Sequence, residues 1–189
     1  NATGCTSIYS GSFPATPYTV NEKGYGPAWA NSLFEDNAEF GFGMQMAAET
    51  MRDRLQTVMV NNFEHMTEEQ KAVCEEWIAN RKNGEKTLEL KDAIEAAFGN
   101  VDTPWAKEIM SLKQFIVKRS QWIIGGDGWA YDIGYGGLDH VIANQLDVNI
   151  LVVDTEVYSN TGGQSSKSAR HGSIAKFTAS GKPGKKKDL

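Results

Sequence analysis

The sequence contains little cysteine, no long apolar run and no excess of positive charge. Its 189 residues include only two cysteines, Cys5 and Cys74. Two are too few for a disulfide framework and indicate a reducing compartment, so we expect a cytoplasmic protein. No apolar stretch approaches the ~18 residues of a membrane span. Because the formal net charge is -5, binding to nucleic acid or to an anionic membrane is not expected.

Histidine is also scarce, and the rest of the composition is ordinary for a globular domain. The three histidines lack metal-ligand spacing, so we expect structural or surface positions for His65, His140 and His171. With 40% hydrophobic and 10% aromatic residues, the chain can form the core of one domain. It begins at Asn1 without a methionine, and we expect a piece of a larger protein, incomplete at both ends.

The patterning divides the chain into three parts. Residues 6–30 are crowded with Ser, Thr, Gly and Tyr and contain Pro14, Pro17 and Pro27, which predicts an extended, turn-rich segment. Apolar residues then recur at intervals of three and four, which is typical of amphipathic helices, before short apolar runs and glycines replace them. We expect one partial domain, 1–189, made of an extended segment (1–31), a helical layer (32–119) and a strand–helix–strand unit with its loop (120–189).

Four helices are predicted in the helical layer from their capping residues and apolar spacing. Cys74 lies on the apolar stripe of the second and is expected to be a buried structural thiol. The predicted helices run from the capping box Ser32–Glu35 to Asn61–Asn62, from the capping box Thr67–Gln70 through Ile78, over about 88–98 to Gly99, and from Thr103–Pro104 through Ile116.

A strand, a glycine turn, a helix and a second strand follow. Residues 121–125 predict a short buried strand, and residues 148–153, which are too short and too β-branched for a helix, predict a second apolar strand. Between them we predict a sharp turn at Gly126-Asp127-Gly128 and a helix over 132–145. This order is typical of a βαβ unit with a parallel strand pair.

The glycine turn is the sharpest chemical signal. Ligands of open parallel sheets bind at the carboxyl ends of the strands, and glycines let the backbone approach a phosphate. Asp127 would repel a bare phosphate, so its presence favours Mg2+ bridging a diphosphate to this carboxylate. The next strand ends at the polar loop 154–160, where Thr155 offers a hydroxyl and the backbone offers a carbonyl.

Four runs of the sequence resemble the thiamine-diphosphate domain of pyruvate:ferredoxin (flavodoxin) oxidoreductases. The runs are Asn1–Cys5, Gly26–Gly41, Gly125–Gly134 and Asp154–Gln164, whereas residues 61–118 match only loosely. The resemblance implies an α/β fold, a parallel-sheet thiamine-diphosphate-binding fold with an inserted helical layer.

The resemblance also implies a set of site residues. Mg2+ would be held by Asp127, the Thr155 hydroxyl and the Val157 carbonyl, and Cys5 would be one ligand of a [4Fe-4S] cluster. Asn160 would face the reacting carbonyl as the catalytic residue. The cofactor would be lined by Gly126, Asp127, Gly128, Trp129, Thr155, Glu156, Val157, Tyr158, Ser159 and Asn160.

The implied activity is oxidative decarboxylation of pyruvate with coenzyme A to acetyl-CoA and CO2, with electrons passing through [4Fe-4S] clusters to ferredoxin or flavodoxin. The expected assembly is a homodimer that includes the remaining domains of the same enzyme. One cysteine cannot supply the four thiolates of a cluster. The family's glutamate that activates the cofactor is not in this sequence either, so we expect the isolated chain to be inactive.

Two alternatives remain open at this point. A non-redox thiamine-diphosphate decarboxylase or synthase would share the Gly-Asp-Gly turn but would have no use for Cys5. A non-catalytic assembly module could keep the same fold. The basic run that ends the sequence, Lys182 to Lys187, is expected to be a solvated tail, with a basic patch for coenzyme A or an acidic ferredoxin as the alternative.

Overall fold

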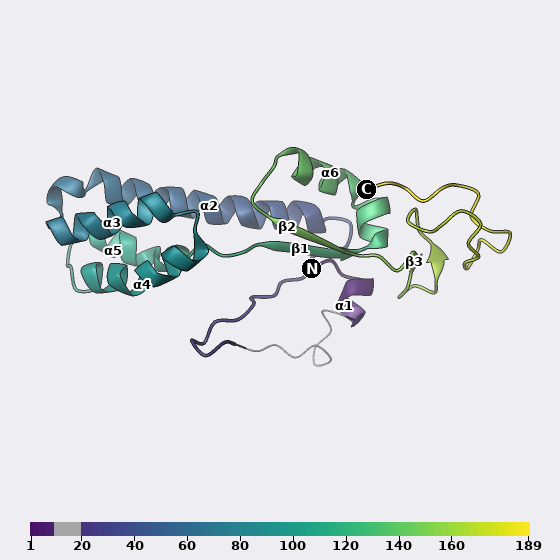
Figure 1. Ribbon diagram of the computed structural model, residues 1–189, viewed down its shortest axis with the longest axis horizontal. Helices are drawn as coiled ribbons and strands as arrows, with labels where there is room; N and C mark the ends of the chain where they lie inside the picture. The colour runs from purple at the N-terminus through teal and green to yellow at the C-terminus, as the bar shows by residue number, and fades with distance from the viewer. Residues whose placement is uncertain (10–19) are drawn as a thin grey trace. The chain divides into compact units, whose positions relative to one another are not determined.

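The computed structural model describes residues 1–9 and 20–189, which form two compact units (Figure 1). The sheet unit combines Asn1–Gly43 with Gln121–Leu189, and the helical unit is Met44–Ser120. Helix α2 (Asn37–Asn61) begins in the first unit and ends in the second. No helix among the described residues is long and apolar enough to cross a membrane.

A parallel strand pair organises the sheet unit and confirms the predicted βαβ unit. Strand β1 (Trp122–Gly126) pairs with β2 (Asn149–Val153), and Gly126 lies opposite Val153. Because the last residues of the two strands are paired, the loops that follow them leave the sheet at the same edge.

The connection between the strands differs from the predicted turn and helix. Asp127 already has helical backbone angles, η3 (Gly128–Ile133) is a π-helix, and α6 (Tyr135–Ala143) begins three residues later than predicted. A π-type bond from the Gly134 N–H to the Trp129 carbonyl, 2.9 Å long, closes the wide turn. The Trp129 ring is the physical reason, since a Cβ at Gly125 or Gly134 would lie 2.2 or 2.4 Å from it.

The N-terminal part of the sheet unit corrects two predictions. A short helix, α1 (Cys5–Tyr9), interrupts the segment expected to be extended, while Pro14 and Pro17 lie outside the described residues. Ser32 does not cap a helix, because it forms a parallel bridge with Ala2 and its N–H donates to the Asn1 carbonyl at 3.1 Å. Helix α2 therefore starts at Asn37.

Four α-helices and two short 3-10 helices build the helical unit. Thr67 and Gln70 form the predicted capping box, and Thr103 caps the predicted fourth helix with Pro104 in its first turn. The third helix starts earlier than predicted because the Asn83 side chain caps it, and the fourth ends at Ser111 rather than Ile116. After α2, the elements are η1 (Phe63–His65), α3 (Glu68–Asn80), α4 (Gly84–Phe98), α5 (Pro104–Ser111) and η2 (Lys113–Phe115).

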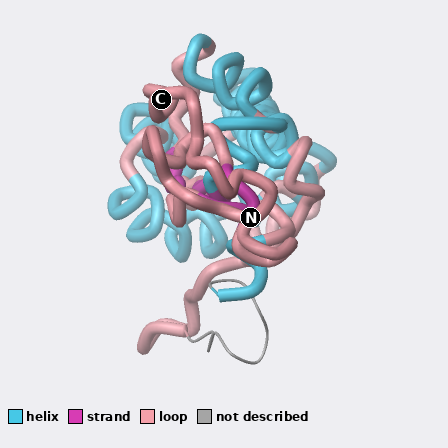
Figure 2. Tube along the Cα trace, turned by 90° about the vertical axis from the view of Figure 1, so that its right-hand side faces the viewer, coloured by secondary structure: helices cyan, strands magenta, loops and turns pink. Residues whose placement is uncertain are grey.

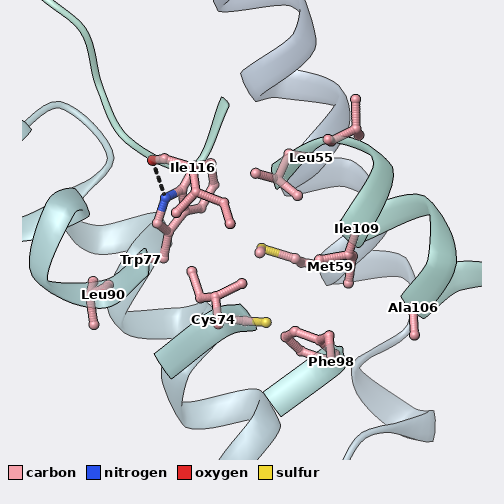
Figure 3. Close-up of a cluster of buried hydrophobic side chains, with 11 residues drawn as sticks. Leu55, Met59, Cys74, Trp77, Leu90, Phe98, Ala106, Ile109 and Ile116 are labelled. Atoms are coloured by element: carbon pink, nitrogen blue, oxygen red, sulfur yellow. Dashed lines mark hydrogen bonds between the residues drawn. The ribbon is translucent and has the colours of Figure 1, made fainter. Parts of the chain in front are cut away.

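Apolar side chains from all of these α-helices meet in one core (Figure 3). The Trp77 indole N–H donates to the Ile116 carbonyl at 2.8 Å, which fixes the segment after α5 against α3. Cys74 is fully buried in this core, and burial raises the pKa of its thiol to about 12. The expectation of a buried structural thiol is confirmed.

Beyond β2 the chain runs mainly as loops (Figure 2). Two short strands, β3 (Val157–Tyr158) and β4 (Gln164–Ser165), pair antiparallel and shape the loop that follows the strand edge. This loop and the helical backbone that begins at Asp127 frame the candidate site.

Candidate functional site

The site is built around Asp127, the first residue after β1. Its carboxyl group is fully buried, and its Oδ1 atom accepts hydrogen bonds from the Thr155 hydroxyl at 3.1 Å and from the Thr155 N–H at 3.4 Å. The pairing of Gly126 with Val153 explains this meeting, because Asp127 is the first residue after β1 and Thr155 is the second residue after β2. The topology therefore joins two residues that are 28 positions apart.

The Thr155 hydroxyl stands among several other oxygens. Its Oγ1 atom lies 3.1 Å from the Val157 carbonyl and 2.8 Å from the Ser159 hydroxyl, in addition to Asp127 Oδ1. A hydroxyl carries one proton, so Thr155 cannot donate to Asp127 and to Val157 at the same time. The three atoms predicted to bind Mg2+ are thus brought together, with more lone pairs than protons between them.

These spacings suit an octahedral cation. Oxygens bound to Mg2+ at about 2.1 Å in neighbouring octahedral positions lie about 3.0 Å apart. The separations of Thr155 Oγ1 from Asp127 Oδ1 and from the Val157 carbonyl, 3.1 Å each, are close to that value. The donor set, one carboxylate, one hydroxyl and one carbonyl, is the hard oxygen chemistry that Mg2+ prefers.

Glu156 contributes to the loop through its backbone. Its φ of 64° lies in the left-handed region, and its N–H donates to Asp154 Oδ1 at 3.0 Å. The Glu156 carboxylate accepts a hydrogen bond from Arg170 Nε at 3.0 Å. The left-handed residue reverses the chain between Thr155 and Val157, so that the Val157 carbonyl lies beside the Thr155 hydroxyl.

Tyr158 covers the backbone of the glycine turn. A Cβ at Gly128 would lie 2.4 Å from the Tyr158 ring, so this position requires glycine. Burial, followed by a hydrogen bond to Asp132, raises the pKa of the Tyr158 phenol, which keeps it protonated. The turn and the predicted cofactor loop are therefore in direct contact.

Trp129 lies in the core of the sheet unit rather than on an open surface. Its ring is almost fully buried, and its indole nitrogen has no hydrogen-bond partner among the described residues. The side chain supports the turn from behind by packing on Gly125 and Gly134. A contact of Trp129 with a cofactor remains a prediction.

Cys5 and Asn160 meet at the same edge of the sheet. The Cys5 thiol donates to Asn160 Oδ1 at 3.2 Å, and a Cβ at Gly126 would lie 3.5 Å from the Cys5 Cβ. Among residues 1–9 and 20–189, no group of three or more His, Cys, Asp or Glu side chains is arranged to hold a metal. A four-thiolate cluster does not fit this chain alone, and Cys5 could supply only one ligand.

The segment after β4 contributes further residues, and among them Ser168 was not singled out from the sequence. The Ser168 hydroxyl donates to Asp127 Oδ2 at 3.2 Å. Lys186 donates to Asp154 at 2.7 Å, and Lys187 donates to the Tyr131 carbonyl at 3.0 Å. Both lysines belong to the basic run expected to be a solvated tail. Lys186 does remain exposed, but these two hydrogen bonds also tie the end of the chain to the site. The serine-rich run 165–168 indicates a polar loop but not which of its serines contacts Asp127.

Comparison with known proteins places the chain beside thiamine-dependent oxidoreductases. The family model "Thiamine pyrophosphate enzyme, C-terminal TPP binding domain" matches residues 109–189. The chain is 53% identical to pyruvate:ferredoxin oxidoreductase of Moorella thermoacetica, covering 100% of the chain and 17% of that relative. It is 52% identical to pyruvate-flavodoxin oxidoreductase of Klebsiella pneumoniae, covering 100% of the chain and 16% of that relative.

A third relative is a dehydrogenase. The chain is 48% identical to the mitochondrial pyruvate dehydrogenase [NADP(+)] of Euglena gracilis, covering 100% of the chain and 11% of that relative. All three similarities span the whole chain, including the parts outside residues 109–189. The chain represents less than a fifth of the length of each of these proteins.

Proposed function

The chain belongs to the pyruvate:ferredoxin and pyruvate-flavodoxin oxidoreductase family, and on this basis we propose that it binds the diphosphate of thiamine diphosphate through Mg2+ within a longer enzyme. The observation that carries the proposal is the convergence of Asp127 Oδ1 and the Val157 carbonyl on the Thr155 hydroxyl at 3.1 Å each. These three oxygens would hold the cation. Gly126 and Gly128 would let the backbone approach the diphosphate.

The remaining loop residues would line the cofactor. The backbone of Glu156 and the hydroxyl of Ser159 are adjacent to the proposed cation site, and Tyr158 lies on the glycine turn. When bound, thiamine diphosphate would supply a nucleophilic carbon and an electron sink for decarboxylation of a 2-oxo acid. Asn160, whose amide is held beside Cys5, would orient the reacting carbonyl by hydrogen bonding.

The proposed reaction of the whole enzyme is oxidative decarboxylation of pyruvate. Pyruvate and the thiol of coenzyme A would give acetyl-CoA, CO2, one proton and two electrons. The electrons would pass one at a time through [4Fe-4S] clusters to ferredoxin or flavodoxin. Cys5 would ligate one cluster together with cysteines from the rest of the enzyme, and its place beside Asn160 supports this role. We propose a cytoplasmic homodimer, and an isolated chain without turnover.

The test is the Mg2+-dependent affinity for thiamine diphosphate of the full-length protein that contains this chain. Asp127→Asn keeps the size of the side chain but removes its charge, so we expect at least a 100-fold loss of affinity in isothermal titration calorimetry. Asp92→Asn, on an exposed position of α4, is the matched control and should bind normally. Unchanged affinity of the Asp127→Asn protein would refute the proposed cation site.

A further inference from the structure

We propose that Ser168 is a positioning residue for the Mg2+ ligand Asp127, with Ser166 orienting its hydroxyl. The inference rests on the proposed function, because it concerns the same cation site. Ser168 is fully buried and Ser166 nearly so, although both lie in a loop-rich part of the chain. Buried hydroxyls need partners, and one partner of the Ser168 hydroxyl is the Asp127 carboxylate.

The direction of the hydrogen bonds follows from their geometry. The Ser168 N–H donates to Ser166 Oγ at 3.2 Å, and the two hydroxyl oxygens are 2.7 Å apart. The Asp127 carboxylate accepts and cannot donate, so the Ser168 hydroxyl is the donor in its 3.2 Å hydrogen bond to Asp127 Oδ2. The Ser166 proton then points to Ser168 Oγ. The result is a one-way relay from Ser166 through Ser168 to the carboxylate.

The two oxygens of the Asp127 carboxylate have different partners. Ser168 holds Oδ2, whereas Oδ1 faces the Thr155 hydroxyl and the proposed cation position. Mg2+ demands near-ideal octahedral geometry, which a carboxylate meets best through one oxygen in a fixed direction. Hydrogen bonds from outer groups to the ligands of a metal typically control such directions.

The neighbouring carboxylate shows why a neutral donor matters here. Asp154 leaves the same edge of the sheet but is paired with the Lys186 ammonium at 2.7 Å. An ammonium group on Asp127 would compete with the cation for the same negative charge. A serine hydroxyl orients the carboxylate and leaves its charge in place. The Ser168 hydroxyl is also within hydrogen-bonding reach of Asp154. Because Asp154 is already paired with Lys186, loss of the Ser168 hydroxyl should act mainly on Asp127.

The experiment measures Mg2+ affinity at saturating thiamine diphosphate in the full-length protein, after removal of bound metal with a chelator. We expect Ser168→Ala to weaken Mg2+ binding by about 10–100-fold, the usual effect of removing an outer partner of a metal ligand. Ser168→Thr keeps the hydroxyl and should restore most of the affinity. Ser173→Ala removes a serine hydroxyl that donates to the Arg170 carbonyl, and the variant should bind like the wild type.

Mn2+ binding followed by electron paramagnetic resonance gives a second readout independent of turnover, and Ser168→Ala should alter the spectrum of the bound ion. Equal Mg2+ affinity of wild type and Ser168→Ala overturns the inference while leaving the proposed function intact. Equal losses in Ser168→Ala and Ser168→Thr also overturn it. If wild type itself shows no Mg2+-dependent binding, the proposed function fails first. Should Ser168→Ala not fold, Ser166→Ala must still weaken Mg2+ binding severalfold for the relay to stand.

Discussion

The two units of the chain use their buried polar groups in different ways. In the helical unit, the buried Arg52 side chain donates to the backbone carbonyls of Phe115, Ile116 and Arg81, all within the same unit. In the sheet unit, the buried Asp127 carboxylate is bonded mainly by side chains of the loops after β2 and β4, Thr155 and Ser168. Hydrogen bonds to backbone carbonyls hold the fold around Arg52. Hydrogen bonds from neutral hydroxyls orient the Asp127 carboxylate and leave its negative charge available to a cation.

The two units also differ in how their large apolar side chains are buried. The helical unit encloses large side chains such as Trp77 and Phe98 in a continuous core. Among the described residues, the main sheet of the sheet unit has two strands, and it leaves Trp122 and Leu151 52% and 44% exposed. Strands of parallel sheets are normally covered on both faces. Each unit therefore has an apolar core of its own, and the candidate site lies in the sheet unit.

The strongest test of this division is Trp77→Ala in the helical unit. The change empties the centre of the core and removes the donor to the Ile116 carbonyl, so we expect a loss of about 3–5 kcal/mol in the free energy of local unfolding. Hydrogen exchange of the α3 and α4 amides measures this loss in the full-length protein. Trp105→Ala, at a half-buried position of α5, should cost clearly less.

Because all proposed cation ligands lie in the sheet unit, the Trp77→Ala protein should retain its Mg2+-dependent affinity for thiamine diphosphate wherever it stays folded. A large loss of that affinity with unchanged hydrogen exchange would break the division between a stabilising unit and a binding unit.

Gly128→Ala should produce the opposite pattern. The added methyl group would lie 2.4 Å from the Tyr158 ring and push the cofactor loop away from the turn. Overpacking of this size costs about 1–3 kcal/mol, so we expect about 5–150-fold weaker cofactor binding by calorimetry, with normal hydrogen exchange in α3 and α4. Gly136→Ala, where a Cβ meets no atom within 4 Å, is the control and should bind normally.

The residues that could be predicted from the sequence are those whose partners are local or follow from the order of the elements. The parallel pairing of β1 with β2 followed from the strand–helix–strand order, and it brings Asp127 and Thr155 together. The contact of Ser168 with Asp127 spans 41 residues through a loop with no regular pattern. Nothing in local spacing reports such a contact, so this part of the site was missed.

The two capping boxes illustrate the same limit. Ser32–Glu35 and Thr67–Gln70 fit one pattern, but only the second caps a helix, since Thr67 exchanges bonds with Gln70 at 3.2 and 3.1 Å. The backbone of Ser32 instead pairs with Ala2, a partner thirty positions earlier. A local signal thus fails where a distant strand-like partner competes for the same backbone groups. The π-turn around Trp129 was missed for the related reason that ring packing determined it.

The smallest expected effect concerns the cap that the sequence identified correctly. Thr67→Ala removes an exposed N-cap oxygen and should lower the free energy of local unfolding of α3 by about 1 kcal/mol, read from amide exchange in its first turns. Thr57→Ala is the matched control, because the Thr57 hydroxyl donates to the Asp53 carbonyl one turn earlier in α2 and caps no helix. Alanine favours a helix interior by a few tenths of a kcal/mol, so this control should stabilise slightly. We expect changes of opposite sign in the free energy of local unfolding for the two variants, with unchanged affinity for thiamine diphosphate in both, so that the effects stay within the helical unit. A change in that affinity would instead show that the site depends on the stability of these helices.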